Sequence, residues 1–181
     1  MKRVTLVTGG ARSGKSRHAL ALMQRYRTKA FIATAEAMDD EMRERIAKHQ
    51  TERDASYLTV EAPLELAEAI HSLPEAAEAA IVDCLTVWMG NLMFRLDEDD
   101  DAIRQAIDGL LDVLKDPPVD IVLVTNEVGM GIVPDNATSR RFRDLAGWLN
   151  QDVAAIADTV TFVVSGIPMN LKEPGEPTCE R

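Results

Sequence analysis

The amino-acid sequence predicts an α/β fold, with a doubly wound, mainly parallel sheet in a single domain. Short runs rich in valine and isoleucine alternate along the chain with segments of helical periodicity. Such alternation is typical of parallel sheets that carry helices on both faces. A glycine-rich motif also stands between the first apolar run and the first helical segment. At this position a loop can direct backbone N–H groups and a helix N-terminus toward an anion.

The expected strands are nearly continuous apolar runs, which fits strands covered on both faces. They are residues 3–8, 30–34, 80–83, 121–125 and 160–164. The expected helices are residues 15–26, 37–52, 64–73, 86–95, 100–114 and 139–156. Residues 168–181 are polar and rich in proline, so we expect a flexible tail behind a domain of residues 1–167.

Composition limits the functional classes. The net charge of −10 disfavours a nucleic acid or an anionic membrane as the main partner. No apolar run approaches the ~20 residues that span a bilayer, and two cysteines in 181 residues argue against a disulfide scaffold. A cytoplasmic protein is therefore expected. Residues 97–101 are all acidic, and we interpret them as a solvated loop before a helix, since they lack the spacing of a calcium loop.

The glycine-rich motif has the full G-x-x-x-x-G-K-S spacing. It consists of Gly9, Gly10, Ala11, Arg12, Ser13, Gly14, Lys15 and Ser16. With a strand before it and a helix after it, the motif predicts a phosphate-binding loop and a fold of the P-loop NTPase type. Lys15, expected at a surface-facing position, would reach the β- and γ-phosphates of a nucleoside triphosphate, and the Ser16 hydroxyl would bind Mg²⁺.

Two acids follow apolar runs. Asp83 ends the third run, where an acid commonly helps to hold Mg²⁺ beside a phosphate-binding loop, although it could simply cap the next helix. Glu127 lies two residues beyond the fourth run and could orient a nucleophile or be an ordinary loop acid. Asn126 does not begin the N-K-x-D motif that reads guanine in regulatory GTPases, which disfavours that class.

His49 is the histidine with the most chemical potential. It shares one face of the expected helix 37–52 with Met42 and Ile46, so it could be an ordinary core residue. Near a bound triphosphate, a neutral imidazole could instead attack the α-phosphorus, and Arg45 and Arg53, four residues away on either side, could receive the phosphate oxygens.

Taken together, the motifs resemble the bifunctional adenosylcobinamide kinase/adenosylcobinamide-phosphate guanylyltransferase family. The resemblance runs from residue 4 to about residue 168. Its most specific pieces are the run from Asn126 to Pro134, read N-E-V-G-M-G-I-V-P, and the run from Arg45 to His49. Further matching pieces are F-I-A-T-A at residues 31–35, V-E-A-P at 60–63 and V-D-C-L-T at 82–86.

The resemblance implies two successive reactions. A nucleoside triphosphate, ATP or GTP, phosphorylates adenosylcobinamide, and GTP then guanylylates His49, which passes GMP to adenosylcobinamide phosphate to give adenosyl-GDP-cobinamide. It also implies a homotrimer and a nucleotide site that includes Ala33, Thr34, Ala35, Arg53 and Glu61. Two alternatives stay open on the residues alone: a simple small-molecule kinase, which would not need His49, and a nucleotide-switched binding protein.

Overall fold

The computed structural model describes residues 2–36, 43 and 56–176. These residues form a seven-stranded sheet in the order β3-β2-β4-β5-β1-β6-β7. The strands are β1 (Val4–Gly9), β2 (Lys29–Ala33), β3 (Tyr57–Glu61), β4 (Ala79–Asp83), β5 (Asp120–Val124), β6 (Thr159–Val164) and β7 (Ile167–Lys172). The strands β1 to β6 pair in parallel, and β7 pairs antiparallel with β6 at one edge.

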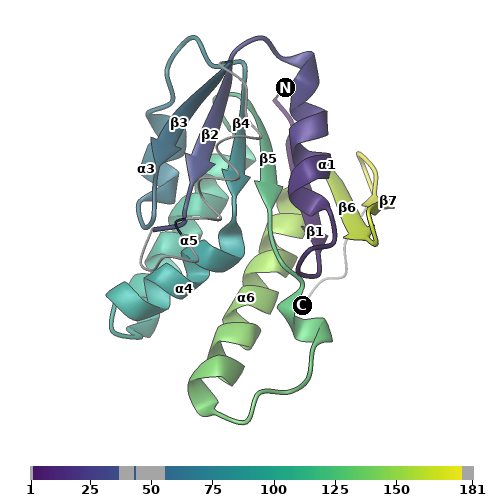
Figure 1. Ribbon diagram of the computed structural model, residues 1–181. Coiled ribbons are helices and arrows are strands. Elements are labelled where there is room, and N and C mark those ends of the chain that lie inside the picture. Colours follow the sequence, from purple (N-terminus) through teal and green to yellow (C-terminus); the bar gives the residue numbers. More distant parts are fainter. Residues whose placement is uncertain (1, 37–42, 44–55, 177–181) are drawn as a thin grey trace.

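Helices cover both faces of this sheet. They are α1 (Lys15–Leu22), α3 (Leu66–His71), α4 (Leu85–Arg95), α5 (Asp100–Lys115) and α6 (Ala137–Ile156), with 3-10 turns η1 (Met23–Arg25) and η2 (Val128–Met130). Figure 1 shows α1 on one side of the sheet and α4, α5 and α6 on the other. The predicted fold class is therefore confirmed. The expected helix 37–52 lies outside the described residues apart from residue 43.

The continuous apolar runs follow from burial on both faces. In β5, Ile121 and Leu123 pack into the larger core under α3 to α6, whereas Val122 and Val124 pack into the smaller core under α1. Successive side chains of a strand point to opposite faces, so a strand covered on both sides needs apolar residues at every position. All five expected strands are found, each within a residue or two of its predicted bounds.

Two edge strands were not predicted. β3 is mostly exposed and has no buried residue, so it lacks the continuous apolar run of an inner strand. The expectation of a flexible tail from residue 168 is wrong for its first part, because residues 168–172 belong to β7. Ser165 and Gly166 have φ values of 53° and 80°, and a two-residue turn with two positive φ values joins antiparallel strands well. Residues 177–181 lie outside the described residues.

Polar contacts fix the ends of two helices. The Asp99 carboxylate accepts from the backbone N–H groups of Asp101 and Ala102, at 2.9 and 3.1 Å, and so caps α5. The Lys172 ammonium donates to the carbonyls of Ala154, Ala155 and Ala157 at the end of α6. Acceptors at a helix C-terminus attract a cation, which ties β7 to α6. Among the described residues, no helix is long and apolar enough to cross a membrane.

Candidate active site

The phosphate-binding loop follows β1 at the carboxyl edge of the sheet, and its backbone requires glycine. Gly9 and Gly14 have φ values of 155° and 99°, a region in which a side chain is strained. A Cβ at Gly9 would lie 2.4 Å from the Val163 carbonyl oxygen on β6 and 2.8 Å from the Ser13 hydroxyl oxygen. The loop is also held by the Gly166 N–H, which donates to the Ser13 carbonyl at 2.8 Å. Gly9 and Gly14 thus let the chain turn tightly between β1 and α1.

The first turn of α1 is arranged to receive an anion. Its N-cap is Gly14, no described side chain caps the turn, and no acid lies in it. The N-terminal N–H groups of α1 are therefore open to phosphate oxygens, and the helix dipole favours negative charge there. The Ser13 hydroxyl oxygen is buried and has no hydrogen-bond partner among the described residues. These features fit a nucleotide polyphosphate.

Lys15 is buried within the loop, with 9% of its surface exposed, which corrects the expected surface-facing position. Its ammonium donates to the Gly10 carbonyl at 3.1 Å. Burial fits the predicted role better than exposure would, because a positive charge acts more strongly on phosphate where little water screens it. Ser16 follows in the first turn of α1 and is half-buried, while Gly10, Ala11 and Arg12 form the exposed tip of the loop.

A second group of predicted residues lies at the ends of β2 and β4. The buried Thr34 hydroxyl donates to the Cys84 carbonyl at 2.9 Å and accepts from the Cys84 N–H at 2.8 Å. Both hydrogen-bonding functions of this hydroxyl are thus used by the backbone next to Asp83. Thr34 therefore positions Asp83, which is half-buried at the end of β4.

Cys84 lies between the two groups. Burial, followed by the negative charge of Asp83, raises the pKa of its thiol to about 11, and the positive charge of Lys15 opposes this increase. α1, which begins at Lys15, also contacts β4, which ends at Asp83, although β5 separates β1 from β4 in the sheet. The structure therefore brings the predicted phosphate-binding lysine and the predicted metal-binding acid together at one edge.

The other predicted nucleotide-site residues surround this edge where they are described. Ala33 and Ala35 are half-buried, and Glu61 is exposed at the end of β3, in register with Ala33. The Asn91 carboxamide donates to the Thr34 carbonyl at 2.7 Å and to the Pro63 carbonyl at 3.0 Å, which holds these two loops together. His49 and Arg53 lie outside the described residues, so their roles stay predictions.

A buried polar network at the end of β5 was not predicted. The Thr125 hydroxyl donates to the Asn150 carboxamide oxygen at 2.8 Å and contacts the Thr86 hydroxyl at 3.1 Å. The Thr86 hydroxyl accepts from the Asn126 N–H at 2.7 Å, and the Asn150 amide donates to the Asn126 carbonyl at 3.2 Å. The one signal in the sequence is Asn150 on the apolar face of α6, between Ala146 and Val153.

This network directs the loop that carries Glu127. The Glu127 N–H donates to the Gly9 carbonyl at 3.1 Å, so the residue is attached to the start of the phosphate-binding loop. Because Asn126 is held on both its N–H and its carbonyl, the path of the chain into Glu127 is fixed by two helices, α4 and α6. Glu127 is therefore held beside the phosphate-binding loop.

Comparison with known proteins agrees with the motifs. The family model for cobinamide kinase/cobinamide phosphate guanyltransferase matches residues 5–171. The bifunctional adenosylcobalamin biosynthesis protein CobP of Pseudomonas aeruginosa is 46% identical over 95% of this chain and 98% of its own length. The bifunctional adenosylcobalamin biosynthesis protein CobU of Escherichia coli is 44% identical over 92% of this chain and 98% of its own length.

Among solved structures, the fold is similar to that of a prototypical ATPase from the type III secretion system of pathogenic bacteria. The TM-score is 0.55 at 10% identity, over 93% of this chain and 56% of that chain. At this identity the likeness concerns the fold alone.

Proposed function

The chain belongs to the cobinamide kinase/cobinamide phosphate guanyltransferase family, and from that premise we propose how its residues divide the two reactions. It is a bifunctional enzyme of adenosylcobalamin biosynthesis, a kinase and a guanylyltransferase. The proposal is that a nucleoside triphosphate first phosphorylates adenosylcobinamide at the phosphate-binding loop. GTP then guanylylates His49, and the GMP passes to adenosylcobinamide phosphate.

The phosphate-binding loop carries the proposal. The support comes from Gly9 and Gly14 at positive φ, the uncapped start of α1 and the buried Lys15, which together offer backbone N–H groups and one ammonium to an anion. Such donors stabilise the charge that develops on transferring phosphoryl oxygens, which is the main catalytic task in phosphoryl transfer. Lys15 is thus proposed to bind the β- and γ-phosphates.

Ser16 and Asp83 are proposed to hold Mg²⁺. The described residues contain no group of three or more histidines, cysteines and acids that could bind a metal alone. One hydroxyl and one carboxylate fit Mg²⁺, which usually keeps several waters and takes its other oxygens from phosphates. The ion would neutralise phosphate charge during transfer.

In the second reaction, His49 is proposed to act as the nucleophile. A ring nitrogen of its neutral imidazole forms a bond to the α-phosphorus of GTP, and the bond to the pyrophosphate oxygen breaks. An oxygen of adenosylcobinamide phosphate then attacks the same phosphorus, and the phosphorus–nitrogen bond breaks to free His49. Nucleophilic catalysis of this kind divides one difficult displacement into two easier ones. We further propose a homotrimer, which the family resemblance supports, and a cytoplasmic location, which the low cysteine content supports.

Labelled GTP tests the proposal directly. With label at the α-phosphate, the wild-type protein is expected to acquire acid-labile, base-stable label. His49→Asn is expected to acquire none and to retain transfer of the γ-phosphate of ATP to adenosylcobinamide. His71→Asn, a change at an exposed histidine at the end of α3, is the matched control and is expected to label normally. Label on the His49→Asn protein would refute the assignment, and absence of both reactions in the wild type would refute the function.

A further inference from the structure

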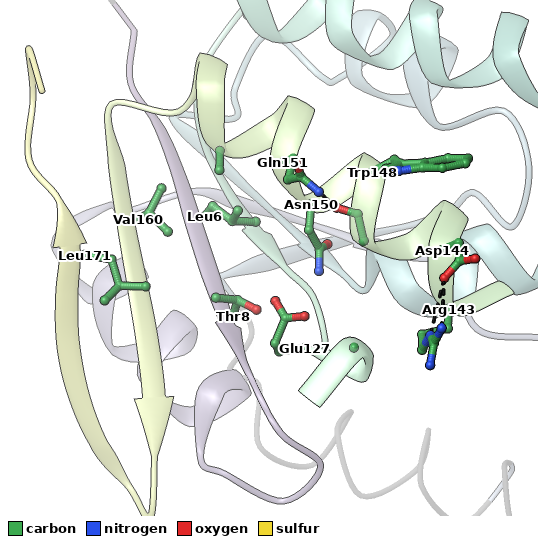
Figure 2. Close-up of a pocket in the computed structure, with 13 residues that line it drawn as sticks. Leu6, Thr8, Glu127, Arg143, Asp144, Trp148, Asn150, Gln151, Val160 and Leu171 are labelled. Carbon is green, nitrogen blue, oxygen red and sulfur yellow. Dashed lines mark hydrogen bonds and ion pairs between the residues drawn. The ribbon is translucent and has the colours of Figure 1, made fainter. Parts of the chain in front are cut away.

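A cavity of about 470 Å³ lies beside the phosphate-binding loop and has no role in the reactions described so far. It is bounded by β1, β6, β7, α6 and the loop after β5. Figure 2 shows Thr8, Glu127 and Asn150 pointing into it from β1, the loop after β5 and α6. Thr8 directly precedes Gly9, so the inner end of the cavity adjoins the loop.

The Thr8 hydroxyl is the first indication of a ligand. Thr8 is 6% exposed, and its hydroxyl oxygen has no hydrogen-bond partner among the described residues. Thr8 continues the series Val4 and Leu6 on the face of β1 that packs under α6, where an apolar side chain would fill the same space. A buried hydroxyl without a partner is destabilising, so its presence at the cavity wall indicates a polar ligand group.

The Glu127 carboxylate is the second indication. It is half-buried, and it makes no hydrogen bond or ion pair with any described residue. Its backbone, in contrast, is fixed on both sides, by the bond to Gly9 and by the contacts of Asn126 with Thr86 and Asn150. Glu127 thus combines a fixed backbone with a carboxylate that has no partner among the described residues. Beside a phosphate-binding loop, this arrangement is expected of a group that accepts a proton from a reacting ligand.

We propose that this cavity binds the alcohol end of the acceptor in the kinase reaction and that Glu127 is the catalytic base. This inference rests on the proposed function. The Thr8 hydroxyl hydrogen-bonds to the acceptor and orients its alcohol. As the alcohol oxygen forms a bond to the γ-phosphorus, its proton passes to a Glu127 carboxylate oxygen. The bond between the γ-phosphorus and the bridging oxygen breaks, the nucleoside diphosphate leaves, and Glu127 returns the proton to water.

The proposal separates the two reactions of the enzyme. Guanylylation of an imidazole requires no proton transfer to Glu127, because the neutral ring nitrogen already carries a lone pair. Kinase turnover, in contrast, requires that the alcohol lose its proton. Loss of the Glu127 carboxylate should thus affect phosphorylation of adenosylcobinamide and leave the first half of the guanylyl transfer in place.

The decisive variant is Glu127→Gln, which keeps the shape of the side chain and removes the base. We expect kcat for phosphorylation of adenosylcobinamide to fall by ~10²–10⁴, the range found for general bases, with KM changed by less than about threefold. Covalent GMP labelling and the thermal midpoint should stay within error of the wild type.

Two further variants complete the test. Thr8→Val should raise KM for adenosylcobinamide by roughly 5- to 10-fold without lowering the thermal midpoint, because it removes a hydroxyl that has no partner among the described residues. Thr8→Ser should restore KM. Glu75→Gln is the control. Glu75 lies in the exposed loop before β4, at the amino ends of the parallel strands and away from the phosphate-binding loop, so this variant should behave as the wild type.

Three outcomes would overturn the inference. Kinase turnover of Glu127→Gln within about threefold of the wild type would mean that Glu127 is not the base. If Glu127→Gln loses GMP labelling as well as kinase activity, Glu127 acts in nucleotide binding and not as the base. An unchanged KM in Thr8→Val would mean that the acceptor does not bind in this cavity. If the wild-type protein lacks kinase activity, the proposed function fails instead, so the two failures are distinguishable.

Discussion

Gly9→Ala should damage both the fold and nucleotide binding, because the new methyl group has no space. A Cβ at this position would lie 2.4 Å from the Val163 carbonyl oxygen and 2.8 Å from the Ser13 hydroxyl oxygen. The Ser13 side chain can rotate away, but Val163 is paired with Gly9 in the sheet and cannot. The φ of 155° adds backbone strain for any residue with a side chain.

The expected destabilisation is about 4 kcal/mol, from roughly 1–3 kcal/mol of backbone strain and roughly 1–3 kcal/mol of overpacking. At about 2–4 °C per kcal/mol for a chain of this size, the thermal midpoint should fall by roughly 8–16 °C. Gly10→Ala is the matched control, because a Cβ at Gly10 would meet no atom within 4 Å. Its free energy of unfolding should stay within about 0.5 kcal/mol of the wild type.

The assay is thermal unfolding of the three proteins in the same buffer, with and without ATP. A midpoint for Gly9→Ala within about 2 °C of the wild type would refute the reasoning, since the sheet would then have moved away from the loop at little cost. A Gly10→Ala midpoint as low as that of Gly9→Ala would also refute it, because the effect would then come from loss of glycine flexibility and not from the Val163 carbonyl.

Three other predictions concern charge at the site. Lys15→Ala should reduce both transfer reactions by ~10²–10³ because it removes a positioned positive charge; assays of kinase activity and GMP labelling in the folded variant check this, and near-normal rates would contradict the loop assignment. Asp83→Asn should raise the Mg²⁺ concentration needed for half-maximal activity by about 10-fold, because the amide keeps the shape but loses the charge; an unchanged Mg²⁺ titration would leave Asp83 as a helix cap. Burial raises the pKa of the Cys84 thiol from 9.0 to about 11, so at pH 8 iodoacetamide should modify it roughly 100-fold more slowly in the native protein than in the urea-unfolded one, as measured by peptide mass spectrometry. The same shift favours the neutral thiol in the folded state, so its contribution to stability is present below pH 9.0 and is lost as the pH rises toward about 11; equal alkylation rates would contradict the burial.

The parts of the fold that the sequence predicts are those with a local cause. Inner strands such as β1 and β5 are buried on both faces, so their apolar runs are unmistakable. The edge strand β3 has a mostly exposed pattern, and β7 carries exposed Ile167, Met169 and Leu171, so neither shows that signal. The turn at Ser165 and Gly166 was the available clue to β7, since two such residues between apolar runs favour a hairpin.

The candidate site, too, is predictable only where its residues are contiguous in the sequence. The phosphate-binding loop is contiguous, so its spacing alone predicts its chemistry. The contacts that aim Glu127 join residues 25 and 39 positions apart, namely Thr125 with Asn150 and Thr86 with Thr125. No local pattern specifies such partners, because threonine and asparagine in apolar segments are also compatible with helix backbonding or solvent contact. Glu127 could therefore be noticed in the sequence, but its attachment to Gly9 could not.

Two sets of buried hydrogen bonds fix the backbone beside the two acids, Asp83 and Glu127. Thr34 holds the backbone beside Asp83 through Cys84, on the β2 side, and Asn150 with Thr86 holds the backbone beside Glu127, on the α6 side. Asp83 ends β4 and Glu127 follows the neighbouring strand β5, and the two sets of contacts meet in the short segment from Cys84 to Thr86. A mutation of Thr34 should consequently move Asp83 more than Glu127, and a mutation of Asn150 should move Glu127 more than Asp83, because each side chain contacts the backbone beside only one of the two acids. Under the two proposals above, the acid on the β4 side holds a metal in both reactions, while the acid on the β5 side acts in phosphorylation alone.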